Sequence, residues 1–341
     1  MPDAPERDEG ASLNEFEIIA RYFAPLAKDK AALGLRDDAA VLVVPERQEL
    51  VLTCDTLVEG VHFLPDDPAD TVGHKALAVT LSDLAAKGAK PYAYLLALSL
   101  PAEVTAAWLE SFASGLGEMQ TQASIALVGG DTTSTPGPLS ITVTAIGHVT
   151  HNHVVLRYGA TAGDRLYVSG TIGDACLGLR LLRDPALAQH WGVSDADTAF
   201  LVERYREPTP RTALALLVRN FGQAAIDVSD GLIGDIEKLC AVSHTGARIE
   251  ANQVPLSEAA EKVLARDPDL LSELITAGDD YEVVVVVAAA SAADFEEEAG
   301  KHEVGFTPIG EILAAGQGVS ALNAQGEPLK LGQKGFSHAW P

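Results

Sequence analysis

The chain has 341 residues, of which 47% are hydrophobic, enough to fill two well-packed domains rather than one. Asp and Glu number 48 against 24 Lys and Arg, and the formal charge of -24 argues against a surface that collects nucleic acid or anionic lipid. The three cysteines lie far apart without a C-x-x-C pair, and no apolar run is long enough to span a bilayer, so we expect a cytoplasmic protein without a zinc or disulfide framework.

The first half of the chain alternates strand-like and helix-like stretches. Short apolar runs predict strands over 39–44 and 50–53, both leading towards Asp55. A mostly buried helix is predicted over 72–87, so that Asp83 lies on a helix and not in a loop. The elements predicted next are a strand over 92–100, a helix over 105–122, and strands over 125–128 and 139–148.

Polar and glycine-containing turns between 149 and 163 interrupt this pattern. We place there the boundary between an N-terminal domain, 1–150, and a C-terminal domain, 151–341. The elements predicted beyond it are strands over 165–169, 225–228, 281–287 and 306–312, helices up to 221, and a helix over 234–242. Alternating strands and helices in both halves predict an α/β protein built from layers of sheet and helix.

Carboxylates that are paired, or that stand beside glycine or a hydroxyl residue, recur along the whole chain. They occur at Asp37-Asp38, Asp55-Thr56, Ser82-Asp83, Gly130-Asp131-Thr132, Asp227-Val228-Ser229-Asp230-Gly231 and Gly278-Asp279-Asp280. Mg²⁺ selects such oxygen ligands, whereas zinc or copper would require nitrogen or sulfur. Several carboxylates can surround a phosphate only if metal ions lie between them, so the set indicates a magnesium-dependent phosphate enzyme.

These residues also have structural interpretations. An Asp beside Gly or Ser is commonly a turn former or a helix cap, and Ser229 or Asp230 could equally cap the helix predicted after them. Arg157 is either an exposed linker residue or a clamp that reaches phosphate from the domain junction. The sequence contains no P-loop and no G-x-G-x-x-G motif, so a nucleotide must be held in another way.

Together these motifs resemble the thiamine-monophosphate kinase family, part of the aminoimidazole ribonucleotide synthetase-like superfamily. The matching stretches are 37–40, 55–63, 75–86, 129–133, 226–232 and 278–282. The stretch 55–63 is typical of the kinases rather than of the whole superfamily, and the similarity spans roughly positions 14 to 338. It implies two α/β domains with mixed sheets flanked by helices, and a homodimer formed through the N-terminal domain. It also implies phosphorylation of thiamine monophosphate by ATP through direct in-line transfer with several Mg²⁺ ions.

The resemblance also implies three sets of site residues. The metal ligands would be Asp38, Thr53, Cys54, Asp55, Asp83, Asp131, Asp227 and Asp230. ATP would contact Gly130, Arg157 and Ser229, and the thiamine substrate would contact His62, Asp279 and Phe336. No catalytic general base is expected, because a phosphate monoester has a second pKa of about 6 and is already largely anionic at neutral pH.

The chain departs from the family pattern at two of these positions. Cys54 stands where the pattern has Thr, which leaves one metal contact to the backbone or a water. Asp279 stands where the pattern has Glu, which shortens the reach to the substrate by one methylene. Two other functions stay open: a related ATP-dependent enzyme with another small acceptor, and a non-catalytic sensor of Mg-nucleotide. The full set of carboxylates disfavours the sensor, because mere binding has less need of several ions around a transferring phosphate.

Overall fold

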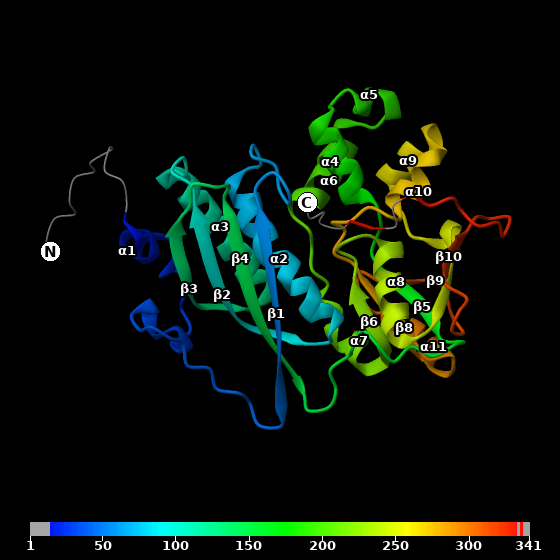
Figure 1. Cartoon of the computed structure of the whole chain (residues 1–341), viewed down its shortest axis with the longest axis horizontal. Helices are drawn as coiled ribbons and strands as arrows, with labels where there is room; N and C mark the ends of the chain where they lie inside the picture. Colours follow the sequence, from blue (N-terminus) through cyan, green and yellow to red (C-terminus); the bar gives the residue numbers. More distant parts are fainter. Residues whose placement is uncertain (1–13, 333–334, 337–341) are drawn as a thin grey trace, which may run out of the picture.

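Two β-sheets with their helices make up the part of the chain that the structure describes, residues 14–332 and 335–336 of a computed structural model (Figure 1). Each sheet contains both parallel and antiparallel neighbours. The predicted class, two α/β units with mixed sheets flanked by helices, is therefore confirmed. The first sheet ends at Thr150 and the second begins at Arg165; the division at 150/151 stays a prediction.

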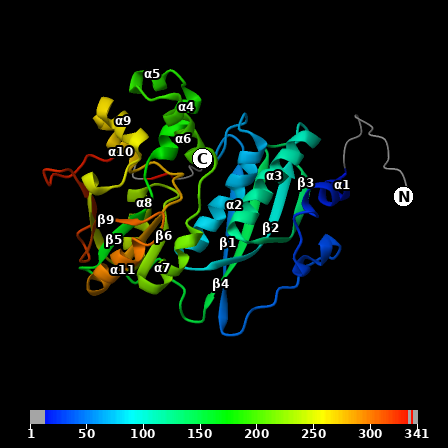
Figure 2. The ribbon, with the colours of Figure 1, turned by 180° about the vertical axis from the view of Figure 1, so that it is seen from behind.

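The first sheet has four strands and is covered by helices on one face. In spatial order the strands are β1 (Gln48–Val58), β4 (Ser140–Thr150), β2 (Lys90–Leu100) and β3 (Ala126–Ser134). Helices α2 (Ala69–Ala86) and α3 (Ala106–Ala123) pack together on the covered face (Figure 2). The chain enters this unit through α1 (Glu15–Ile18), a π-helix at Ile19–Phe23 and a 3-10 helix at Lys30–Leu35 that contacts β3.

Strand β1 alternates between the two faces of this sheet. Thr53, Asp55 and Leu57 point towards the helices, whereas Leu52 and Cys54 are exposed on the opposite, outer face. Leu52 keeps 62% of its surface accessible to solvent, and Leu95 of β2 also stands on the outer face with 37% accessible. The outer face therefore leaves apolar side chains exposed, although residues of the segment 35–42 line a common cavity with Leu95 and Thr142.

The second sheet has six strands and a core on both faces. In spatial order they are β10 (Val319–Leu322), β7 (Gly246–Glu250), β9 (Phe306–Leu313), β5 (Arg165–Ser169), β8 (Val283–Val287) and β6 (Gly222–Asp227). Its helices are α4 (Asp174–Arg183), α5 (Leu187–Trp191), α6 (Asp195–Arg206), α7 (Ala215–Phe221), α8 (Leu232–Ser243), α9 (Glu258–Arg266), α10 (Leu271–Leu274) and α11 (Ala292–Ala299). The five consecutive valines of β8 are all buried and divide between two hydrophobic clusters, as expected for a strand covered on both faces.

Helix α2 joins the two units, because it packs against the first sheet and also contacts β6 and β8 of the second. Leu77 and Leu81 belong to the core of the first unit, whereas Ala85 and Ala86 pack with Val285 of β8. A helix that is apolar nearly all round fits this position between two layers. The prediction that Asp83 lies on a helix is thus confirmed, and its carboxylate stands where the two units meet.

Three predictions for the first unit need correction. Residues 39–44 form no strand; they run as an extended segment towards β1. The strand predicted over 50–53 continues to Val58, so Asp55 lies within it and not at its end. The strand predicted over 125–128 likewise continues through Asp131 to Ser134, because it pairs with β2 along that whole stretch. No helix among residues 14–332 combines the length and the apolar character that crossing a membrane requires.

Candidate active site

A cavity of about 410 Å³ lies at the junction of the two units. Strand β1, helix α2, the loop after β6 and the loop before β8 form its walls. Its lining residues include Cys54, Asp55, His62, Asp83, Asp227, Ser229, Asp230, Asp279 and Phe336. The structure therefore brings together nine of the fourteen residues that the sequence analysis assigned to a site.

Two carboxylates of this cavity come from the first unit. Thr53 and Asp55 share the inner face of β1, and the Thr53 hydroxyl donates a hydrogen bond to the Asp83 carboxylate on α2. Burial, together with the nearby Asp83 charge, raises the pKa of the Asp55 carboxyl to about 6. The two carboxylates thus repel each other in a partly dry site, an arrangement that a bound cation would stabilise.

The end of β6 adds Asp227 to the cavity, and the loop after β6 adds Asp230. Asp227 is buried, and burial and the Asp83 charge raise its pKa well above the ordinary value. One carboxylate oxygen of Asp235 accepts hydrogen bonds from the backbone N–H groups of Ser229, Asp230 and Gly231, at 3.1, 3.0 and 3.2 Å. Asp235, on α8, therefore fixes the shape of this loop.

Those bonds settle the capping alternative for Ser229 and Asp230. The N-cap of α8 is Gly231, and it makes no side-chain capping bond. Neither Ser229 nor Asp230 caps the helix, so both side chains are left to line the cavity. Lys238 contacts the carboxylates of both Asp230 and Asp235, with 2.7 Å to the latter, and it supplies positive charge to this edge of the cavity.

The loop before β8 is held against the loop after β6. The Asp279 N–H donates to the Ser229 carbonyl at 2.9 Å, and the Tyr281 N–H donates to the Val228 carbonyl at 2.8 Å. The two backbones approach so closely that a Cβ at position 278 would lie 2.3 Å from the Ser229 carbonyl oxygen. Only glycine fits there, which explains the Gly278 that precedes Asp279.

The two remaining candidates for substrate contact lie at other walls of the cavity. The ring nitrogen Nδ1 of His62 accepts a hydrogen bond from the Val58 N–H at 3.0 Å, so this nitrogen is unprotonated in the bonded tautomer. Phe336 is anchored by its N–H, which donates to the Asp230 carbonyl at 2.9 Å, and half of its surface is exposed. An apolar ring and a set of carboxylates therefore line the same cavity.

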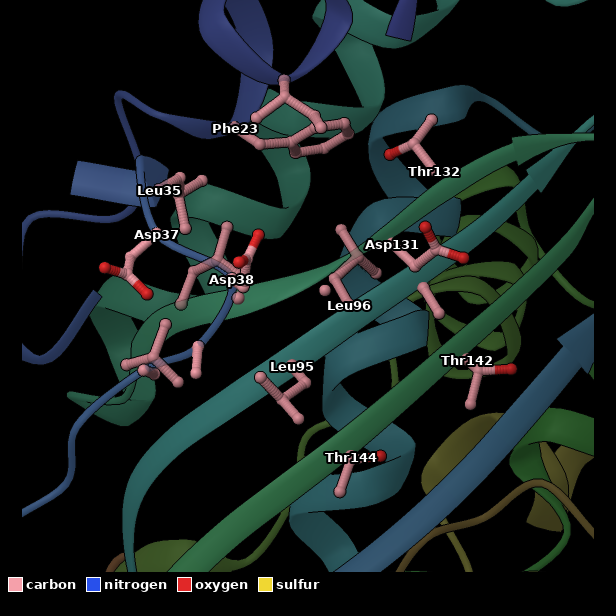
Figure 3. A pocket seen from close by; sticks show the side chains of 18 of the residues that line it. Phe23, Leu35, Asp37, Asp38, Leu95, Leu96, Asp131, Thr132, Thr142 and Thr144 are labelled. Carbon is pink, nitrogen blue, oxygen red and sulfur yellow. The ribbon is translucent and has the colours of Figure 1, made fainter. Parts of the chain in front are cut away.

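A second, larger cavity of about 850 Å³ holds other candidate residues, among them Asp38, Gly130 and Asp131 (Figure 3). Asp38 lies on the exposed segment before β1, and Asp131 is exposed on the outer side of β3. Gly130 is required by a close approach of strands, because a Cβ there would lie 1.8 Å from the Leu96 carbonyl oxygen. This cavity extends over the outer face of the sheet, where Thr142 and Leu95 also line it.

The first sheet separates these two groups of carboxylates within one chain. Cross-strand neighbours place Thr56, Thr142, Ala97 and Asp131 in one row from β1 to β3, the two edges of the sheet. Three strand spacings separate the edges by about 14 Å, and Asp55 points to the other face. Among residues 14–332 and 335–336, no three His, Cys, Asp or Glu side chains converge closely enough to hold a metal ion.

Arg157 lines neither cavity and lies exposed between β4 and β5. It stands near Lys87 at the end of α2, a residue that the sequence analysis missed. Burial and the Arg157 charge lower the pKa of Lys87 to about 8, against the opposing influence of Asp227 and Asp83. The Lys87 ammonium donates to the Ala225 carbonyl at 2.7 Å. Two cationic side chains therefore lie near the acidic cavity without lining it, at the junction of the units.

A buried ionic network anchors the chain just after Asp279. The Glu282 carboxylate accepts a hydrogen bond from Ser169 at 2.6 Å and forms ion pairs with Arg204, at 2.9 Å, and with Arg211. The neighbouring Asp280 accepts a hydrogen bond from the Gly173 N–H at 2.8 Å. Asp280 and Glu282 are completely buried, so the network holds the loop before β8 from within the second unit.

Replacing Glu282 with Gln should lower the free energy of unfolding by about 3 kcal/mol or more, because it leaves the partly buried Arg211 without its counter-charge and the buried Arg204 with only its 3.7 Å pair to Asp174. Urea-induced unfolding measures this loss. The matched control is Glu273→Gln, which breaks a half-exposed pair with Arg180 and should cost less than about 1 kcal/mol. Equal losses for the two variants would contradict the anchoring role of Glu282.

Comparisons with known proteins agree over nearly the whole chain. The family model "AIR synthase related protein, N-terminal domain" matches residues 36–149, and "AIR synthase related protein, C-terminal domain" matches residues 161–323. The thiamine-monophosphate kinase of Caulobacter vibrioides is 44% identical over 311 residues, which are 90% of this chain and 86% of that protein.

Solved structures give the same result. A thiamine-monophosphate kinase from Stenotrophomonas maltophilia has a TM-score of 0.81 and 42% identity, over 93% of this chain and 98% of that chain. The protein AaThiL, solved in complex with AMPPCP and TMP, has a TM-score of 0.73 and 27% identity, over 86% of this chain and 89% of that chain.

Proposed function

Because this chain belongs to the thiamine-monophosphate kinase family of AIR synthase related proteins, we propose that it transfers the γ-phosphate of ATP to thiamine monophosphate, forming thiamine diphosphate. The observation that carries the proposal is the identity of 44% with a kinase of that name over 90% of this chain. The complex of AaThiL with AMPPCP and TMP supports the choice of both substrates. The acidic cavity at the domain junction supplies the place for the reaction.

Mg²⁺ is the metal that the donor set fits. Asp55, Asp83 and Asp227 offer only oxygen ligands, and a cation between them would offset the burial of Asp55 and Asp227 and their repulsion by Asp83. Mg²⁺ bound there would neutralise the phosphate oxygens during transfer. Asp230 and the Thr53 hydroxyl would complete this group, and Cys54 would contribute through its backbone carbonyl or a bound water.

The remaining candidate residues divide between the two substrates. His62, Asp279 and Phe336 would receive thiamine monophosphate, with the ring of Phe336 against the heterocycles. Ser229, Gly130 and Arg157 would contact ATP, the last through its planar guanidinium group. The acceptor phosphate is largely anionic at neutral pH and needs no general base, so these residues would act by binding and orienting the two phosphates for in-line attack.

We further propose that the active form is a homodimer whose sites combine residues from both protomers. Asp38 and Asp131 lie on the outer side of the sheet, at the edge opposite Asp55, so one chain cannot bring all these carboxylates to one metal cluster. The exposed apolar outer face, with Leu52 and Leu95, offers a surface for pairing two copies. A partner's Asp38 and Asp131 would then complete the cavity at the domain junction.

Two features bear on the setting in which the enzyme would work. All three cysteines, Cys54, Cys176 and Cys240, are free thiols, which supports the proposal of a reducing, cytoplasmic location. The formal charge of -24 disfavours a nucleic-acid partner. It is compatible with small phosphate substrates that bind together with a metal cation.

A coupled assay for ADP tests the proposed function. Purified protein with ATP and Mg²⁺ should release ADP only after thiamine monophosphate is added, and EDTA should stop the reaction. ADP release that ignores thiamine monophosphate would contradict the proposal and favour a different acceptor. Nucleotide binding without any release would favour the non-catalytic sensor.

A further inference from the structure

Lys75 on α2 is completely buried, although it carries a charge. Its side chain keeps only 2% of its surface accessible, and its ammonium group lies 3.3 Å from a carboxylate oxygen of Asp279. The same ammonium group stands 3.9 Å from the centre of the Tyr205 ring, close enough for a cation–π contact. Lys75 therefore joins three elements: α2, α6 and the loop before β8.

We infer that Lys75 is a positioning residue, which holds the Asp279 carboxylate in the orientation that binds thiamine monophosphate. This inference rests on the proposed function and assigns a role to a residue outside both the metal site and the cavity lining. Lys75 does not touch the substrate in this account; it acts through Asp279.

The contacts of Asp279 show why such a residue is needed. Its carboxylate has two oxygens: one is paired with Lys75, and the other accepts a hydrogen bond from the Tyr281 hydroxyl at 3.1 Å. The backbone of Asp279 has a φ of +74°, in the left-handed region that few residues other than glycine adopt and in which aspartate is enriched. Its N–H bond to Ser229 fixes the main chain, whereas Lys75 and Tyr281 hold the side chain, which is 28% accessible and lines the cavity.

The pairing also determines what Asp279 can recognise. A carboxylate repels phosphate groups, so it faces the heterocyclic end of the acceptor and not ATP. With Lys75 beside it, the net charge of the pair is close to zero. Asp279 then acts as an oriented acceptor of hydrogen bonds, and the lone pairs left free by Lys75 and Tyr281 point to where an N–H donor of the substrate must lie.

The same loop connects this contact to the metal site. Asp279 and Tyr281 are bonded to Ser229 and Val228, next to the metal-ligand candidates Asp227 and Asp230. Removing Lys75 frees the Asp279 side chain and ends the contact with Tyr205. It leaves the backbone bonds of the loop and the Glu282 network in place, because neither involves Lys75. We therefore expect a selective loss of acceptor binding and not a general loss of catalysis.

Steady-state kinetics of Lys75→Met test the inference, with both substrates varied. We expect KM for thiamine monophosphate to rise about tenfold or more, while kcat and KM for ATP stay within about twofold of the wild-type values. Titration calorimetry with thiamine monophosphate alone should show the same weakening without turnover. Lys75→Arg, which keeps the charge, should recover part of the affinity.

Arg206→Met is the matched control. It breaks a partly buried contact between the units, the 2.7 Å ion pair of Arg206 with the buried Asp67, and neither residue lines the cavity. This variant should lower the melting temperature but leave KM for thiamine monophosphate within about twofold. Tyr281→Phe keeps Lys75 and removes the other bond to Asp279, so it gives a second test if Lys75→Met does not fold.

The outcomes separate the inference from the proposed function. If the wild-type protein shows no phosphate transfer to thiamine monophosphate, the proposed function fails. If the wild-type protein is active and both Lys75→Met and Tyr281→Phe keep its KM for thiamine monophosphate, the inference alone is wrong. A lowered kcat together with equal rises in KM for ATP and for thiamine monophosphate would also overturn it, because this result would indicate a structural role for Lys75.

Discussion

Replacing Asp55 with Asn is expected to stop phosphate transfer and, at the same time, to stabilise the metal-free protein. Loss of one metal-binding carboxylate should lower kcat by roughly a hundredfold or more, since metal ions supply several kcal/mol of stabilisation to the transition state. Without metal, the Asp55 charge is buried beside Asp83, which raises its pKa from 3.8 to about 6. An amide of the same shape carries no such penalty.

The pH dependence of this gain follows from the raised pKa. An acid whose pKa is raised on folding binds more protons in the folded state, so the wild-type protein loses stability as pH rises from about 4 to about 6. Above that window the penalty is fully present and amounts to about 3 kcal/mol. Asp55→Asn should therefore gain up to about 3 kcal/mol at pH 8, and nothing below pH 4.

Urea unfolding in EDTA, at several pH values, measures the gain. The control is Asp66→Asn, which changes an exposed carboxylate and should alter stability by less than about 0.5 kcal/mol at any pH. An Asp55→Asn variant that is inactive but no more stable than the wild-type protein at pH 8 would show that the charge of Asp55 does not destabilise the metal-free protein. Retained activity would remove Asp55 from the metal site.

Two variants that are inactive by themselves should regain activity when they are combined in one dimer. Asp55 and Asp131 lie at opposite edges of the sheet, and we propose that each site takes Asp55 from one protomer and Asp131 from the other. A heterodimer of Asp55→Asn with Asp131→Asn then has one doubly altered site and one intact site. Purified through two different affinity tags, it should have about half of the wild-type activity.

A second heterodimer supplies the control for this experiment. Asp55 and Asp227 line the same cavity of one chain, so a heterodimer of Asp55→Asn with Asp227→Asn has damage in both sites and should stay inactive. Activity in this control, or no activity in the first heterodimer, would contradict a site shared between protomers.

Local patterns predicted much of this fold because the elements concerned are continuous, strongly apolar runs. The helix that carries Asp83 and the strand of consecutive valines are read from neighbouring residues alone. The apolar run 39–44 misled the prediction, because Ala40 and Leu42 pack against the core while the run itself pairs with no strand. The strand Gly246–Glu250 was missed because it is short and holds one glycine and two charged residues.

The candidate site was harder to predict, because its geometry depends on strand pairing between distant parts of the chain. The motifs identified the carboxylates, but they could not show that Asp131 stands on the edge opposite Asp55; that follows from the order of the four strands. Lys75 was missed as a functional residue, although a charge among the alanines and leucines of a buried helix was a usable signal. Asp235 gave no such signal, since its role is to bind backbone N–H groups of its own chain.

Transfer of labelled phosphate tests the central claim most directly. The protein is incubated with ATP labelled at the γ-phosphate, Mg²⁺ and thiamine monophosphate, and the products are separated and counted. We predict that the label appears in thiamine diphosphate, in an amount equal to the ADP formed. Label found only in inorganic phosphate, or remaining in ATP, would contradict the assignment of this chain as a kinase that phosphorylates thiamine monophosphate.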